Sequence, residues 1–182
     1  DRFPPFLNQL NHQARRVHPA PQIQPLTADM HHPPFADQSF DLIWSEGAIY
    51  IMGYDHGLNC WRPLLRPGGY LVVTELSWFK PNPPDELLTY WQVNYPAMRS
   101  VAENLHAAER QGWKPIGDFP LPLAAWTEDY YAPLQDRFPA FLAAHANDPD
   151  AQAVVAMTEQ EIAMMNRYAD HCGYQFYVLR SQ

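Results

Sequence analysis

The sequence is poor in cysteine and in basic residues, and it contains no long apolar run. Its two cysteines, Cys60 and Cys172, lie far apart without metal-ligand spacing, which indicates neither a disulfide framework nor a zinc module. Lysine and arginine total 12 against 20 acidic residues, and the net charge of −8 gives no basic field for a phosphate backbone. No stretch approaches the ~18 apolar residues of a membrane span, and the first residues do not resemble a secretory leader. These absences predict a soluble, cytoplasmic protein that binds neither nucleic acid nor membrane and acts on a small molecule.

The first forty residues predict a helix, a strand and a loop. Apolar residues recur with the spacing of one helical face, at Phe6, Leu10, Ala14 and Val17. Pro19 and Pro21 are expected to end this helix. Residues 23–26 then have the composition of a short strand.

The next segment predicts a strand, a crossover helix and a second strand. The apolar run at residues 40–44 is typical of a strand covered on both faces. Asp55 can cap a helix to Leu65 that Pro63 distorts, and residues 70–76 form the following strand. Because such units are overwhelmingly right-handed and parallel, the pattern predicts a doubly wound α/β sheet.

The remaining residues predict four helices and two more strands. The helices are expected over residues 85–95, 101–111, 127–145 and 148–170, and the strands over residues 115–121 and 174–179. Thr127 and Asp148 are the expected caps of the last two helices.

Several ordered motifs resemble those of one enzyme family. They are residues 27–30, 34–41, 44–50 and 65–69, followed by Trp78-Phe79, Trp91, Tyr95-Pro96, residues 126–128 and residues 173–177. Together they resemble the class I S-adenosylmethionine-dependent methyltransferases, and most closely the small-molecule group related to the ubiquinone and menaquinone methyltransferases, in a bacterial subgroup. The resemblance implies a Rossmann-like, mostly parallel sheet with an antiparallel final strand.

The sequence departs from this family at its start. No Gly-x-Gly occurs, although the family uses a glycine-rich loop after its first strand to approach the cofactor. By comparison with the family, the first two strands are missing, so residues 1–182 are predicted to be a single, N-terminally incomplete domain with helical insertions at about 79–100 and 124–170. We expect this piece alone not to be a stable, cofactor-binding monomer, because the gap would expose a central sheet edge.

The candidate catalytic residue is Glu46. It follows the strand at residues 40–44, where ligands of open α/β sheets bind, so it suits a substrate-facing carboxylate or base. A helix-capping or otherwise structural carboxylate is the alternative. Ser45 and Gly47 flank it and are expected to contact the cofactor.

Three further residues resemble the family's cofactor contacts. Asp29 and Met30 match the pair that meets the adenine, and Asp1 matches the acidic residue that binds the ribose hydroxyls. For Asp29 the alternative is a turn aspartate with an apolar neighbour. S-adenosylmethionine is the cofactor that these matches imply.

Aromatic residues outside the core strands suggest a substrate cavity. Tyr50, Trp78 and Trp126 are the candidate substrate contacts, and ordinary helix packing is the alternative. No metal site is predicted: adjacent His31 and His32 rarely share one ion, and His56 and Cys60 at helical spacing lack further ligands.

The sequence therefore predicts methyl transfer from S-adenosylmethionine to a small-molecule acceptor, with catalysis resting on proximity and water exclusion. A truncated, catalytically silent binding protein is the alternative, and a Rossmann-type oxidoreductase is a weaker one. The acceptor atom and the oligomeric state stay open, a homodimer included.

Overall fold

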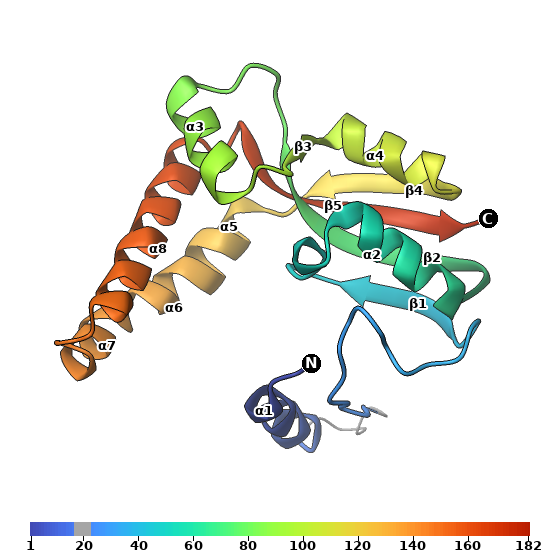
Figure 1. The fold of residues 1–182 in the computed structure, drawn as a ribbon, viewed down its shortest axis with the longest axis horizontal. Helices are drawn as coiled ribbons and strands as arrows, with labels where there is room; N and C mark the ends of the chain where they lie inside the picture. Colours follow the sequence, from blue (N-terminus) through green and yellow to red (C-terminus); the bar gives the residue numbers. More distant parts are fainter. Residues whose placement is uncertain (17–22) are drawn as a thin grey trace.

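The computed structural model describes residues 1–16 and 23–182 as a mixed α/β protein (Figure 1). The strands are β1 (Phe40–Ser45), β2 (Leu65–Trp78), β3 (Arg99–Ser100), β4 (Trp113–Pro120) and β5 (Cys172–Ser181). The helices are α1 (Pro4–Ala14), α2 (Tyr54–Trp61), α3 (Asp85–Asn94), α4 (Val101–Arg110), α5 (Leu123–Trp126), α6 (Ala132–Gln135), α7 (Phe138–Ala144) and α8 (Pro149–Arg167). Short 3-10 turns η1 (Ile49–Ile51) and η2 (Arg62–Leu64) and a π-helical turn η3 (Thr127–Tyr131) join them.

The sheet has the strand order β1-β2-β5-β4, and β3 adds a short bridge to β2. β1 and β2 are parallel, as the strand-helix-strand pattern predicted, and β5 is antiparallel to both β2 and β4. β2 and β4 therefore run in the same direction, and β5 is reversed. The expected Rossmann-like sheet with an antiparallel final strand is confirmed.

The main core lies between one face of the sheet and helices α2 and α4 (Figure 1). Leu71 and Val73 of β2 and Leu179 of β5 are fully buried against Leu58 of α2 and Ala108 of α4. Alternate residues of a strand share one face, so these strands contribute every second side chain to this core.

Buried hydrogen bonds tie α4 to the sheet. Asn104 Nδ2 donates to Ser77 Oγ and to Tyr177 OH, at 3.2 Å each, and the two hydroxyls lie 2.7 Å apart. All three side chains are almost completely buried. Because these three buried side chains are hydrogen-bonded to one another, the network fixes α4 against β2 and β5.

The opposite face of the sheet is less covered, which corrects one prediction. Residues 40–44 were expected to be buried on both faces, yet Leu42 and Trp44 are 49% and 57% exposed. β1 pairs only with β2 among the described residues, and α2 covers only its other face. The apolar run therefore predicted the strand correctly and its burial wrongly.

Two predictions for the first forty residues have different outcomes. α1 forms as expected up to Ala14, whereas Val17, Pro19 and Pro21 lie outside the described residues. The strand predicted at residues 23–26 is wrong, because that segment has no regular structure. Isolated backbone bonds join this part of the chain to Asp1, whose amine donates to the Leu26 carbonyl and whose carbonyl accepts from Ala28 N.

The helical region after β4 begins earlier than predicted. α5 starts at Leu123, and Thr127 is no cap, because its hydroxyl donates to the Leu123 carbonyl within the helix. Pro133 lacks the N–H that would continue an α-helical ladder, and the π turn η3 precedes it. Asp148, by contrast, caps α8 as predicted, accepting from Asp150 N and Ala151 N.

Ser100 starts α4 with a capping box, which gives a stability prediction. Its hydroxyl accepts from Glu103 N at 3.2 Å, and the Glu103 carboxylate accepts from Ser100 N at 2.8 Å. Ser100→Ala should lower the free energy of unfolding by about 1 kcal/mol, because an orphan N–H at the helix start loses its acceptor. Urea denaturation of the full-length protein measures this, with Gln160→Ala at an exposed position of α8 as control. A loss no larger than that of the control would contradict the prediction.

Candidate functional site

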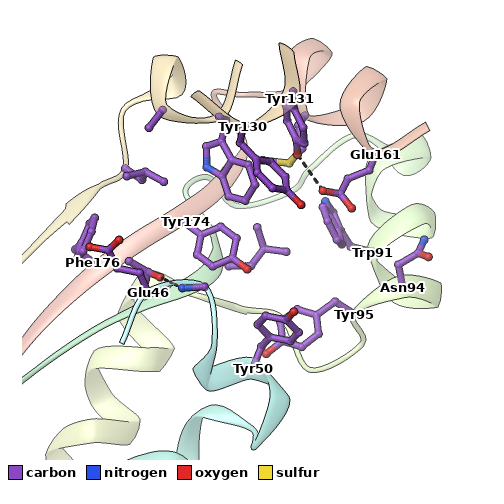
Figure 2. A pocket seen from close by; sticks show the side chains of 17 residues that line it. Glu46, Tyr50, Trp91, Asn94, Tyr95, Tyr130, Tyr131, Glu161, Tyr174 and Phe176 are labelled. Carbon is purple, nitrogen blue, oxygen red and sulfur yellow. Dashed lines mark hydrogen bonds between the residues drawn. The ribbon is translucent and has the colours of Figure 1, made fainter. Parts of the chain in front are cut away.

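A cavity of about 510 Å³ lies where β1 ends, beside the later half of β2 and the first residues of β5 (Figure 2). Residues of α3, α5, η3 and α8 line its other sides. Its lining consists of Glu46, Gly47, Tyr50, Thr74, Leu76, Trp91, Asn94, Tyr95, Leu121, Ala125, Trp126, Tyr130, Tyr131, Glu161, Met165, Tyr174 and Phe176. A mostly apolar concavity with a few polar groups at the carboxyl end of parallel strands is typical of a ligand site.

The turn after β1 supplies two of the predicted site residues. Gly47 has a left-handed backbone with φ of +55°, and its N–H donates to Thr74 Oγ1 at 2.7 Å. A Cβ added at Gly47 would meet no atom within 4 Å, so the cavity is open at this point. Glu46 is exposed beside it, and its Oε1 accepts from Trp44 Nε1 at 2.6 Å.

Aromatic rings form most of the cavity wall. Trp126 lies 4.9 Å from Tyr174, 5.6 Å from Tyr130 and 5.4 Å from Tyr131, measured between ring centroids. Figure 2 shows Tyr50 and Tyr95 together on the side of the cavity away from Tyr130 and Tyr131. The Trp126 indole N–H has no hydrogen-bond partner within the described part of the chain.

Two carboxylates that the sequence did not single out lie at or behind this wall. Glu161 of α8 lines the cavity, and its Oε1 accepts from Tyr131 OH at 2.9 Å. Glu75 of β2 is only 2% exposed and accepts from Tyr95 OH, while its Oε2 has no partner among the described residues. Burial raises the pKa of Glu75 to about 7, although the Tyr95 hydroxyl and Arg99 oppose the shift.

The carboxylates also act on the tyrosines of the wall. Burial is the largest cause of the raised pKa of Tyr130, Tyr131 and Tyr174, and the negative charge of Glu161 raises each of them further. All three phenols are therefore neutral donors at neutral pH.

The predicted substrate residues divide between the cavity and the core. Tyr50 and Trp126 line the cavity with Glu46 and Gly47. Trp78, at the end of β2, lies in the packing cluster around Leu87 and Met165 and does not line it. The side chain of Trp78 thus follows the packing alternative.

The predicted cofactor residues Asp1, Asp29, Met30 and Ser45 lie outside the cavity lining. Asp29 Oδ1 accepts from His31 N at 3.0 Å and lies 2.8 Å from His31 Nδ1, contacts that lower the pKa of Asp29. Met30 packs against the main core, and its carbonyl accepts from Trp61 Nε1. The amine and carbonyl of Asp1 bond to Leu26 and Ala28, which brings Asp1 beside the segment that leads to Asp29.

Cys60 Sγ lies 3.2 Å from His56 Nε2, the helical pair considered as ligands. Across residues 1–16 and 23–182, no three His, Cys, Asp or Glu side chains gather as a metal-binding group. None of the helices in the same ranges has the length and apolar character to cross a membrane.

Comparison with known proteins finds a family match over less than half of the chain. The family model of the methyltransferase domain matches residues 1–73. No curated protein matches the chain significantly.

Solved structures share the fold at low sequence identity. A SAM-dependent methyltransferase from Thiobacillus denitrificans, in complex with S-adenosyl-L-homocysteine, has a TM-score of 0.80 and 19% identity, with 100% of this chain and 74% of that chain covered. A SAM-dependent methyltransferase from Geobacter sulfurreducens, with the same ligand, has a TM-score of 0.78 and 20% identity over 97% and 72%. YjhP from E. coli has a TM-score of 0.82 and 18% identity over 100% and 75%. About a quarter of each of these proteins therefore has no counterpart in this chain.

Proposed function

From a chain that has the class I methyltransferase fold and whose residues 1–73 match the methyltransferase domain family, we propose S-adenosylmethionine-dependent methyl transfer to a small-molecule acceptor. The observation that carries the proposal is the aromatic cavity at the carboxyl end of β1 and β2, with Glu46 and Gly47 at its edge. A cavity of about 510 Å³ has the size of sites for small organic ligands.

The described residues fit parts of the proposed cofactor. The open space at Gly47 would let a ligand approach the backbone after β1 closely. Asp29 offers carboxylate oxygens and Met30 an apolar side chain for the adenine, and Asp1 lies close to this segment. When bound, S-adenosylmethionine supplies a methyl group on a positively charged sulfur, which makes the methyl group electrophilic.

The residues of this chain would then position the acceptor and exclude water. The rings of Tyr50, Tyr95, Trp126 and Tyr174 enclose an apolar acceptor body, and Glu46 can accept a proton from the acceptor group. No nucleophilic side chain is required, because alignment of acceptor and methyl group provides most of the rate.

Calorimetric titration of the full-length protein with S-adenosylhomocysteine tests the proposal. We expect saturable binding with one site, followed by methyl acceptance in a screen of small metabolites. The 182-residue chain is titrated alongside, because it covers only 74% and 72% of two solved methyltransferases and we propose that it does not hold the cofactor by itself. Absence of binding to the full-length protein would overturn the methyltransferase assignment, whereas binding to the short chain would overturn only the proposal about the short chain.

A further inference from the structure

The charges around the aromatic cavity are all of one sign. Glu46 and Glu161 are its charged lining residues, and neither lysine, arginine nor histidine lines it within the described part of the chain. No cation among residues 1–16 and 23–182 comes within ion-pairing distance of either carboxylate. The charged groups of the lining would therefore repel an anionic acceptor, and the net charge of −8 adds to this repulsion.

The aromatic wall on the Glu161 side suits a cation. Tyr131 donates to Glu161 Oε1, and Tyr130 lies 5.3 Å from Tyr131 between ring centroids. Figure 2 shows Trp91 next to Glu161 on this side of the cavity. Electron-rich ring faces attract an ammonium group, and a partly buried carboxylate strengthens that attraction.

A wholly apolar acceptor suits the same side poorly. Packing an apolar group against Glu161 would remove water from a carboxylate whose hydrogen-bond partner among the described residues is a single phenol, Tyr131. Burying a charge without a compensating partner is unfavourable, so the carboxylate disfavours such a ligand.

We propose that the acceptor is a small amine or ammonium compound whose positive charge lies among the aromatic rings beside Glu161, while its reacting group reaches the Glu46–Gly47 edge. Glu46 and Glu161 lie on opposite sides of the cavity, which separates the charged group from the reacting one (Figure 2). This substrate class rests on the proposed function, because that function makes the cavity an acceptor site.

Binding of a charged probe and its neutral isostere tests the inference without a methyl-transfer assay. Choline and 3,3-dimethylbutan-1-ol have the same shape and differ in the charge of one atom. Each is titrated into the full-length protein at concentrations up to about 10 mM, with calorimetry and with tryptophan fluorescence, since Trp91 and Trp126 line the cavity. We expect choline to bind at least about tenfold more tightly, as a cation–π contact beside a carboxylate would give.

Variants then identify the groups responsible. Glu161→Gln should weaken choline binding at least about fivefold and leave the neutral alcohol unchanged, while Glu159→Gln on the exposed face of the same helix should change neither. Tyr130→Leu is a second variant in case Glu161→Gln does not fold, because the ring that it replaces is 52% exposed. It too should weaken the binding of choline and leave the binding of the neutral alcohol unchanged.

Equal binding of the two probes, tighter binding of the alcohol, or no measurable choline binding would overturn the inference. S-adenosylhomocysteine titration of the same sample separates the two proposals. If S-adenosylhomocysteine binds but choline is not preferred over the alcohol, the proposed acceptor class is wrong and the proposed methyltransferase function is retained. If choline is preferred but S-adenosylhomocysteine does not bind, the proposed methyltransferase function is wrong and the preference of the cavity for cations is retained.

Discussion

The free energy of unfolding of the wild-type protein is expected to fall by about 3 kcal/mol as the pH rises from about 4.5 to about 7, and Glu75→Gln is expected to abolish this fall. Glu75 lies in β2 and is 2% exposed, so its ionised form is desolvated. Its Oε2 has no partner among the described residues, and its Oε1 accepts from Tyr95 OH. One hydrogen bond does not compensate a buried carboxylate for the loss of water.

The sign follows from proton linkage. Burial raises the folded-state pKa of Glu75 to about 7, whereas the unfolded chain keeps the ordinary value of 4.5. Between these values the unfolded state has released the proton and the folded state holds it, so the free energy of unfolding falls with increasing pH. Above pH 7 both states are ionised and the full loss is reached. Glutamine has the acceptor oxygen for Tyr95 but no titration, so the variant lacks this slope.

Urea denaturation at intervals between pH 4 and pH 8 measures the effect, as the difference in slope between wild type and Glu75→Gln. Glu128→Gln, an exposed glutamate in η3, is the matched control and should retain the wild-type slope. Tyr95→Phe removes the hydrogen bond that lowers the pKa of Glu75. The free energy of unfolding of this variant should therefore continue to fall to a higher pH than that of the wild type. Parallel curves for wild type and Glu75→Gln would show that Glu75 titrates normally in the fold.

The predictable part of the fold is the part whose residues interact locally. The helix from Asp85 and the Asp148 cap followed from spacing and cap chemistry, because these are set by neighbours along the chain. The burial of Trp44 and the strand at residues 23–26 failed because both depend on which strands and helices lie alongside. A residue pattern indicates that a strand prefers to be buried, whereas the neighbouring strands and helices determine how much of it is buried.

The sequence singled out Glu46, Gly47, Tyr50 and Trp126 among the cavity residues, and it did not single out Glu161 or Glu75. Glu46, Gly47 and Tyr50 follow β1 directly, so the end of a predicted strand was enough to bring them to one edge. Glu161 is in the middle of α8, and only the tertiary packing of α8 beside η3 brings it to the cavity. Glu75 had a signal in the sequence, since a carboxylate within the apolar run of residues 70–76 must be buried when that run is a central strand.

The second large effect is expected at Glu46. Glu46→Gln should lower the turnover of the full-length enzyme by about 100-fold and leave the affinity for S-adenosylhomocysteine unchanged, because glutamine cannot accept the acceptor's proton. Glu46 lines the cavity and is exposed, and the Trp44 indole N–H at 2.6 Å holds its Oε1. The carboxylate is thus oriented at the edge of the cavity and remains accessible from it.

A structural role for Glu46 predicts a different set of results, and Trp44→Phe distinguishes the two. Phenylalanine keeps an aromatic ring on β1 and removes only the donor to Glu46, so a base role predicts a smaller loss of turnover, with the pH profile still set by a carboxylate. In Glu46→Gln the part of the pH profile that follows ionisation of a carboxylate should vanish. Glu128→Gln should keep both the wild-type turnover and the wild-type pH profile. If Glu46→Gln turns over at the wild-type rate, Glu46 is no base, and alignment in the aromatic cavity must supply the catalysis by itself.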